Sequence, residues 1–154
     1  MEIELLKSSH SVGEANYHLQ FTPAYRSDIF ADDLVRMLTR DYLLAAASKW
    51  GITIAAIGFG PDHVHLFCTN CKNYGPAQVT KLLKGFSGFM MRKHHSELFK
   101  KKLWGNKFWS CGYFYRTVGA VNSWTVSRYV EQSQSKHWKI AIGKQTKLIE
   151  FAEN

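Results

Sequence analysis

Residues 52–69 read ITIAAIGFGPDHVHLFCT and describe two strands joined by a tight turn. Residues 52–59 are rich in β-branched side chains, which favours a strand. Pro61 and Asp62 form a turn, and an apolar run follows them. Side chains alternate between faces along a strand, so His63 and His65 are expected to project from the same face. The stretch therefore predicts an antiparallel hairpin that carries two imidazoles side by side.

Two imidazoles held one pleat apart on a rigid strand can bind a single divalent ion. His63 and His65 are therefore candidate metal ligands. The alternative is a pair of polar histidines on a half-buried sheet face. The His-x-His spacing alone does not decide between these two interpretations.

The rest of the chain supplies the elements around this hairpin. Alternation predicts strands, and helical spacing of apolar residues predicts helices. The expected strands cover residues 16–21, 52–59, 63–69 and 111–118, and the expected helices cover residues 31–50, 76–94 and 124–135, with a short helical piece from Ser96. In the second helix the stripe expected to face the core consists of Val79, Leu82, Leu83, Phe86, Phe89 and Met90.

The order strand, helix, strand, strand, helix, strand is that of a ferredoxin-like split βαβ fold. This α+β arrangement is a four-stranded antiparallel sheet with helices on one face, here followed by a C-terminal helix. The length of 154 residues fits a single domain over 1–154, with a core of about 15–137 and a tail of about 138–154.

The positive charge of the chain is concentrated in one segment. The net charge is +8, and residues 72–107 hold nine Lys or Arg against Glu97 alone, whereas residues 1–71 have a net charge of −3. Such a segment favours a polyanionic partner such as nucleic acid. The alternative is a solvated basic face without a partner. The candidate contacts to phosphate groups are Lys81, Lys84, Arg92 and Lys93.

Cysteine usage and hydropathy indicate a cytoplasmic protein without a membrane-spanning segment. The three cysteines are an odd number, and the acidic N-terminus does not resemble a signal peptide. Cys68 and Cys71 form a CxxC pair, but a structural zinc site usually needs a second pair, which this chain lacks. No apolar run reaches the ~20 residues that a membrane-spanning helix needs.

Five motifs in the same order resemble those of one known family. Residues 60–66 look like the "PDHVHL" signature of single-tyrosine HUH transposases, the enzymes of the smallest bacterial and archaeal insertion sequences, which move as single-stranded DNA. Residues 17–26 are similar to the family's first strand and the "PKYR" turn after it, and residues 79–87 are similar to its "KLLKGRSS" helix. Residues 103–114 are similar to "LWG…WSRGYF", and residues 128–131 are similar to "RYIE". The resemblance spans about residues 15–135.

This resemblance implies the roles of the site residues. Tyr129 would attack a DNA phosphodiester and form a covalent 5′-phosphotyrosine. His63 and His65 would hold Mg²⁺ or Mn²⁺ against the scissile phosphate. The implied substrate is single-stranded DNA with hairpin ends. The implied assembly is a homodimer in which the histidine pair of one subunit works with the tyrosine of the other.

The sequence departs from the family pattern at the third metal ligand. The family usually has a glutamine four residues after the tyrosine, where this chain has Ser133. Gln132, three residues after Tyr129, lies on the same side of a helix and is the preferred third ligand. Ser133 could instead bind through water, and the departure could also mark weak metal binding or an inactive copy.

Three other functions are compatible with the sequence. The first is a domesticated relative that cuts repeat hairpins without mobilising an element. The second is a non-catalytic single-stranded nucleic-acid-binding protein, whose binding would depend on salt and not on metal. The third is a small metalloenzyme with an incidental basic segment, which would show no preference for DNA.

Overall fold

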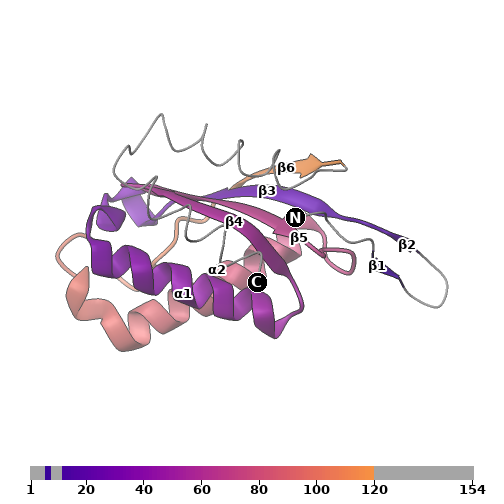
Figure 1. Cartoon of the computed structure of the whole chain (residues 1–154). Helices are drawn as coiled ribbons and strands as arrows, with labels where there is room; N and C mark the ends of the chain where they lie inside the picture. Colours follow the sequence, from indigo (N-terminus) through magenta and orange to yellow (C-terminus); the bar gives the residue numbers. More distant parts are fainter. Residues whose placement is uncertain (1–5, 8–11, 120–154) are drawn as a thin grey trace.

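The computed structural model of the chain describes residues 6–7 and 12–119 (Figure 1). Its centre is a four-stranded antiparallel sheet with the strand order β4-β5-β3-β6. The strands are β3 (Asn16–Phe21), β4 (Thr53–Gly60), β5 (His63–Thr69) and β6 (Phe114–Val118). Helices α1 (Asp33–Lys49) and α2 (Pro76–His95) lie together on one face of the sheet (Figure 1). This is the predicted ferredoxin-like topology.

Shorter elements complete the described chain. A two-stranded sheet of β1 (Leu6–Lys7) and β2 (Val12–Gly13) precedes β3. Three short 3₁₀ helices are present among the described residues, namely η1 (Ala24–Arg26), η2 (Ile29–Ala31) and η3 (Ser96–Leu98). The last of these is the helical piece expected from Ser96. The helix expected over residues 124–135 and the tail lie outside the described residues.

The core lies between the sheet and the two helices. Val64 and Leu66 of β5 are fully buried there, as are Leu19 and Phe21 of β3. Because side chains alternate along a strand, the residues between them belong to the opposite face of the sheet. His63 and His65 therefore lie on the face away from α1 and α2, as the alternation in the sequence predicts.

Local signals explain where the helices begin and end. The Oδ1 atom of Asp32 accepts hydrogen bonds from the backbone N–H groups of Leu34 at 2.9 Å and Val35 at 3.1 Å, which caps the start of α1. Gly51 follows the end of α1 with φ of +70°, a conformation that favours glycine. Pro76 occupies the first turn of α2, where its missing N–H costs nothing.

The expected core stripe of α2 is wrong at Phe89. This side chain is 61% exposed, whereas Val79, Leu83 and Met91 are fully buried. The buried face of α2 is therefore rotated away from Phe89. The ring of Phe89 instead lies 5.6 Å from the ammonium of Lys93, an arrangement that keeps both groups near solvent.

The fourth strand begins at Phe114 and not at Cys111 as the sequence predicts. The carbonyl groups of Ser110 and Gly112 accept hydrogen bonds from the Lys84 ammonium of α2, at 2.6 and 3.1 Å. The segment before β6 is therefore bound to α2, and it does not continue the strand pairing with β3.

In the part of the chain that the structure describes, neither α1 nor α2 has a stretch apolar enough to cross a bilayer.

Candidate active site

His63 and His65 are neighbours on the sheet face opposite the helices. Both residues are buried, with exposed fractions of 4% and 9%, and their ring centroids are 4.8 Å apart at an angle of 85°. In the sheet register His63 lies opposite Gly60, and His65 lies between Gly58 of β4 and Gln20 of β3. The rigid hairpin thus holds two imidazoles close together, as a two-histidine metal site requires.

Gly60 provides the space that the His63 ring occupies. A Cβ atom built on Gly60 would lie only 2.2 Å from Cε1 of His63 and 2.7 Å from both ring nitrogens. No side chain other than that of glycine fits at this position without displacing the imidazole. Gly60 therefore leaves room for the His63 ring and belongs to the candidate site.

Asp62 holds the His63 ring from the turn. The Oδ1 atom of Asp62 lies 2.8 Å from Nδ1 of His63, and its Oδ2 atom lies 3.6 Å from the guanidinium of Arg26. The hydrogen bond to His63 is the main reason that the pKa of Asp62 is lowered, with further contributions from the charges of His63 and Arg26. Asp62 is thus an ionised carboxylate at neutral pH, and it accepts a hydrogen bond from the Nδ1–H group of His63.

His18 holds the His65 ring from the neighbouring strand. The Nε2 atom of His18 lies 3.2 Å from Nδ1 of His65, and the two rings stack with centroids 5.3 Å apart. Burial and the nearby charge of Arg116 lower the pKa of His18 to about 4. The His18 ring is therefore neutral at pH 7, and its Nε2 atom can accept a hydrogen bond from the Nδ1–H group of His65.

These contacts indicate which atoms would bind a metal ion. With Nδ1 of His63 engaged by Asp62 and Nδ1 of His65 engaged by His18, the coordinating atom of each ring would be Nε2. Metal-binding histidines commonly have this arrangement, in which an outer partner fixes the ring and its tautomer. The glycine cradle and the two outer partners therefore fit an ion held by His63 and His65.

The described residues supply only part of a metal site. Among residues 6–7 and 12–119 no group of three or more His, Cys, Asp and Glu side chains is placed to hold an ion. The two histidines therefore have no His, Cys, Asp or Glu side chain placed beside them as a third ligand among these residues. The predicted nucleophile Tyr129, the predicted ligand Gln132 and its alternative Ser133 all lie outside the described residues.

The four predicted DNA contacts fall into two pairs. Lys81 and Lys93 are exposed on α2. Lys84 and Arg92 are partly buried and bind the backbone that follows α2: Lys84 donates to Ser110 and Gly112, and the Arg92 guanidinium donates to the carbonyl groups of Leu103 and Lys107. The second pair therefore fixes residues 103–112 against α2.

The two cysteines of the CxxC pair belong to the protein interior. Cys68 and Cys71 are both buried and free of disulfide bonds. Burial raises the pKa of both thiols, that of Cys71 to about 12. Both groups stay protonated at neutral pH, and a protonated thiol is a poor metal ligand.

Sequence reasoning found the histidine pair but missed its supporting residues. His18, Asp62 and Gly60 gain their roles only from the pairing of β3 with β5 and of β4 with β5. Two kinds of residue alternate from Asn16 to Phe21, and this alternation places His18 on the same face as Asn16 and Gln20. This signal could have suggested that His18 shares a face with His63 and His65.

The described chain is thus an α+β protein with a ferredoxin-like sheet, and its His-x-His pair lies on the face opposite α1 and α2. The chain belongs to the IS200-like transposases, since the family model described as "Transposase IS200 like" matches residues 11–133.

Individual relatives agree with this assignment. The chain is 28% identical over 136 residues to the ISDra2 transposase TnpA of Deinococcus radiodurans. This match covers 88% of the present chain and 96% of the relative. It is 26% identical over 124 residues to the transposase for insertion sequence element IS200 of Salmonella typhimurium, covering 80% and 79% of the two chains. A crystal structure of a protein from Deinococcus radiodurans R1, assigned as a transposase, superposes with a TM-score of 0.64 at 27% identity, over 82% of this chain and 96% of that one.

Proposed function

We propose that this protein cleaves and rejoins single-stranded DNA at the ends of an insertion sequence through a 5′-phosphotyrosine on Tyr129. In this proposal His63, His65 and Gln132 hold Mg²⁺ or Mn²⁺. The observation that carries it is the paired imidazoles, each fixed at Nδ1 by an outer partner, in a member of a transposase family.

The chemistry follows from the nucleophile. The Tyr129 oxygen attacks the scissile phosphorus, the bond between phosphorus and the 3′-oxygen breaks, and the proton lost by the tyrosine ends on the departing 3′-hydroxyl. The energy of the phosphodiester is kept in the phosphotyrosine, so a second 3′-hydroxyl can reverse the step without ATP. When bound, a divalent ion polarises a non-bridging phosphate oxygen and offsets the negative charge of the transition state.

The residues of this chain have defined tasks in that reaction. His63 and His65 would hold the ion, while Asp62 and His18 keep the two rings in place. Exposed cations of α2, Lys81 and Lys93, bind DNA phosphates. Lys84 and Arg92 support this surface through their backbone hydrogen bonds.

A homodimer with shared active sites is part of the proposal. Strands β4 and β6 form the edges of the described four-stranded sheet. An edge strand exposes unpaired N–H and C=O groups, and pairing with a second copy would cover them.

The test uses a single-stranded oligonucleotide from the hairpin that flanks the gene, labelled at both ends. The wild-type protein is expected to cut it only with Mg²⁺ or Mn²⁺. His63→Ala and His65→Ala should each abolish this cleavage while leaving binding to the oligonucleotide. Cleavage by either variant at the wild-type rate would exclude that histidine as a ligand.

One alternative function has an observation in its favour. The basic face of α2 and the exposed aromatic residues of β6 also suit a protein that binds single-stranded nucleic acid without cutting it. Tight, salt-dependent binding to the correct hairpin, with no cleavage at any metal concentration, would support that function instead.

A further inference from the structure

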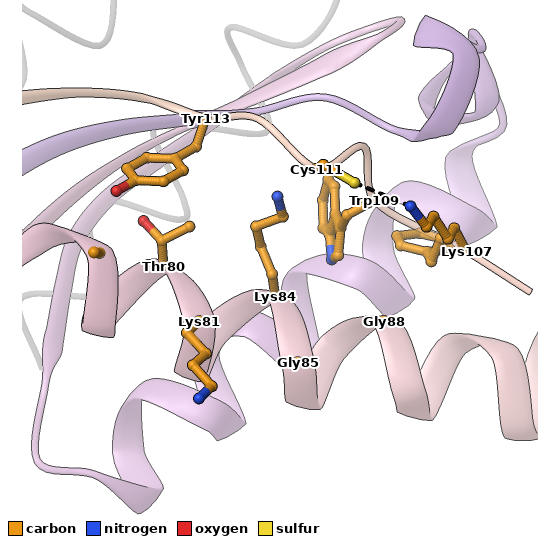
Figure 2. A pocket seen from close by; sticks show the side chains of 11 residues that line it. Thr80, Lys81, Lys84, Gly85, Gly88, Lys107, Trp109, Cys111 and Tyr113 are labelled. Atoms are coloured by element: carbon orange, nitrogen blue, oxygen red, sulfur yellow. Dashed lines mark hydrogen bonds between the residues drawn. The ribbon is translucent and has the colours of Figure 1, made fainter.

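An exposed cysteine lines a pocket beside α2. The pocket has a volume of about 450 Å³ and opens between α2 and residues 107–113 (Figure 2). Cys111 is one of its lining residues and is exposed, whereas Cys68 and Cys71 are buried. The family motif "WSRGYF" has arginine where this chain has Cys111. The thiol is therefore a feature of this chain that the family resemblance does not explain.

Two lysines make the Cys111 thiol reactive. The Lys107 ammonium donates a hydrogen bond to Sγ of Cys111 at 3.0 Å, drawn as a dashed line in Figure 2. This hydrogen bond is the main reason that the pKa of Cys111 is lowered, and the charges of Lys107 and Lys84 contribute further. The thiolate, not the thiol, attacks a disulfide. Cys111 is thus the cysteine of this chain that is suited to thiol–disulfide exchange.

The charge of the pocket favours an anionic reagent. Lys81, Lys84 and Lys107 line it, and none of the described residues that line it is acidic. An ammonium has three N–H donors. The hydrogen bonds from Lys84 to the carbonyl groups of Ser110 and Gly112 use two of them. One donor of Lys84 therefore remains for a carboxylate that enters the pocket.

Thr80 provides a second, independent indication of a ligand. Thr80 is 4% exposed, and its hydroxyl is buried without a hydrogen-bond partner among the described residues. Figure 2 shows this hydroxyl directed toward Tyr113, into the space that the pocket encloses. Thr80 and Lys84 are four residues apart on α2 and are therefore neighbours on its surface. Burying a hydroxyl without a partner is unfavourable, and a carboxylate would accept its hydrogen bond.

We propose that Cys111 forms a mixed disulfide with an anionic low-molecular-weight disulfide, whose carboxylates bind the lysines of the pocket and the Thr80 hydroxyl. The Cys111 thiolate attacks one sulfur of the reagent and forms a new S–S bond. The S–S bond of the reagent breaks, and its other half leaves as a thiolate that takes up a proton. Cys111 is oxidised and the departing half is reduced, so no further oxidant is needed. The volume of the pocket is in the range that holds one small organic ligand.

The consequence of the modification for DNA rests on the proposed function, in which exposed cations of α2 bind DNA phosphates. The adduct brings carboxylates next to Lys81 and offsets part of the positive charge of that surface. Affinity for single-stranded DNA should therefore fall when the adduct forms and return when a reductant removes it. The oxidation state of Cys111 then regulates DNA binding.

The experiment follows adduct formation on the whole protein without DNA, by mass spectrometry in an excess of oxidised glutathione. The wild-type protein should gain one glutathionyl group on Cys111, and dithiothreitol should remove it. Cys111→Ser should gain none. The cationic disulfide cystamine should react with the wild type at least about tenfold more slowly, after each rate is divided by that for the neutral thiol mercaptoethanol.

Two variants separate recognition of the reagent from reactivity of the thiol. Thr80→Val keeps the shape of the side chain and removes the hydroxyl, so it should slow the reaction with oxidised glutathione about fivefold. Its reaction with iodoacetamide, which has no carboxylate, should keep the wild-type rate. Lys81→Met should also slow the glutathione reaction. Its matched control Lys93→Met removes an equal charge from α2 outside the pocket, and at about 0.15 M salt it should react like the wild type.

The inference can be overturned at each of its steps. An adduct on Cys68 or Cys71 would overturn the choice of cysteine. Equal normalised rates for oxidised glutathione and cystamine, or the wild-type glutathione rate in both Thr80→Val and Lys81→Met, would overturn recognition by the pocket. Unchanged affinity of the modified protein for the hairpin oligonucleotide would overturn the regulation of DNA binding.

The proposed function and the modification site can fail separately, because the adduct is measured without DNA or metal. If the adduct forms as expected on a protein that makes no phosphotyrosine, the modification site stands and the transposition chemistry fails. If the phosphotyrosine forms while Thr80→Val and Lys81→Met react like the wild type, the inference fails alone.

Discussion

Nε2 of His18 lies 3.2 Å from Nδ1 of His65, across the pairing of β3 with β5. This contact links a histidine of the family signature to a histidine of β3 for which the sequence analysis proposed no role. It resembles the carboxylate contact that Asp62 makes with His63. The two candidate ligands are thus fixed by chemically different partners, a neutral imidazole and a carboxylate.

Replacing His18 should weaken metal binding without removing a ligand. His18→Phe keeps an aromatic ring in the sheet but loses the hydrogen bond to His65. Loss of such an outer partner typically lowers metal affinity about 10- to 100-fold, and calorimetry with Mn²⁺ would measure it. His94→Phe, at an exposed position of α2, serves as the control. Unchanged Mn²⁺ affinity in His18→Phe would contradict a positioning role.

Gly60→Ala should damage the site by displacing the His63 ring. The added methyl group would clash with the imidazole, so both Mn²⁺ affinity and the melting temperature should fall. The same change at Gly85, in the interior of α2 with open space around it, should raise the free energy of unfolding by about 1 kcal/mol. A Gly60→Ala protein that binds Mn²⁺ as well as the wild type would show that His63 does not need the cradle.

The lysines of α2 should separate into structural and DNA-binding residues. Lys84→Met removes two hydrogen bonds to the backbone and should lower the free energy of unfolding by about 1.5 kcal/mol. Lys93→Met should leave unfolding by urea unchanged. It should instead make the slope of log affinity for DNA against log salt concentration shallower by about 0.7. This is the effect of one lost contact to a phosphate of single-stranded DNA. A less stable Lys93→Met protein, or a Lys84→Met protein of unchanged stability with a shallower salt slope, would contradict these assignments.

Cys111 should react faster than the other two cysteines. The Lys107 ammonium donates a hydrogen bond to its sulfur at 3.0 Å, and this contact lowers the pKa of the exposed Cys111 thiol. The thiolate therefore forms at lower pH than in an ordinary cysteine, and the alkylation rate should reach its midpoint at lower pH. Lys107→Met should move that midpoint upward. Mass spectrometry would identify which cysteine is alkylated first. Faster alkylation of Cys68 or Cys71 than of Cys111 would contradict the prediction.

The sequence predicted those parts of the fold that depend on local patterns. Alternation was enough to place His63 and His65 on one face, with Val64 in the core, and the order of elements was enough for the topology. Apolar spacing predicts Phe89 in the core, but it does not reveal how a helix is rotated against a sheet. The local pattern predicts a strand over residues 111–113, but the tertiary hydrogen bonds from Lys84 to Ser110 and Gly112 cannot be inferred from it.

The supporting residues of the site could not be predicted for a related reason. The contact of His18 with His65 depends on the register between strands that lie far apart in the sequence. The role of Gly60 depends on a distance across the hairpin, which the turn residues alone do not determine. Lys84 and Arg92 carry the positive charge expected of DNA contacts, and their hydrogen bonds to backbone carbonyl groups add a structural role that the sequence does not reveal.

The most direct test of the proposed chemistry asks whether Tyr129 becomes linked to DNA. The wild-type protein and Tyr129→Phe would be incubated with Mn²⁺ and an oligonucleotide from the flanking hairpin, labelled separately at each end. The proposal predicts an SDS-resistant adduct that carries only the label 3′ of the cut, maps to Tyr129 by mass spectrometry, and is absent from the variant and without metal. An adduct that persists in Tyr129→Phe, or DNA cleavage without any adduct, would contradict it.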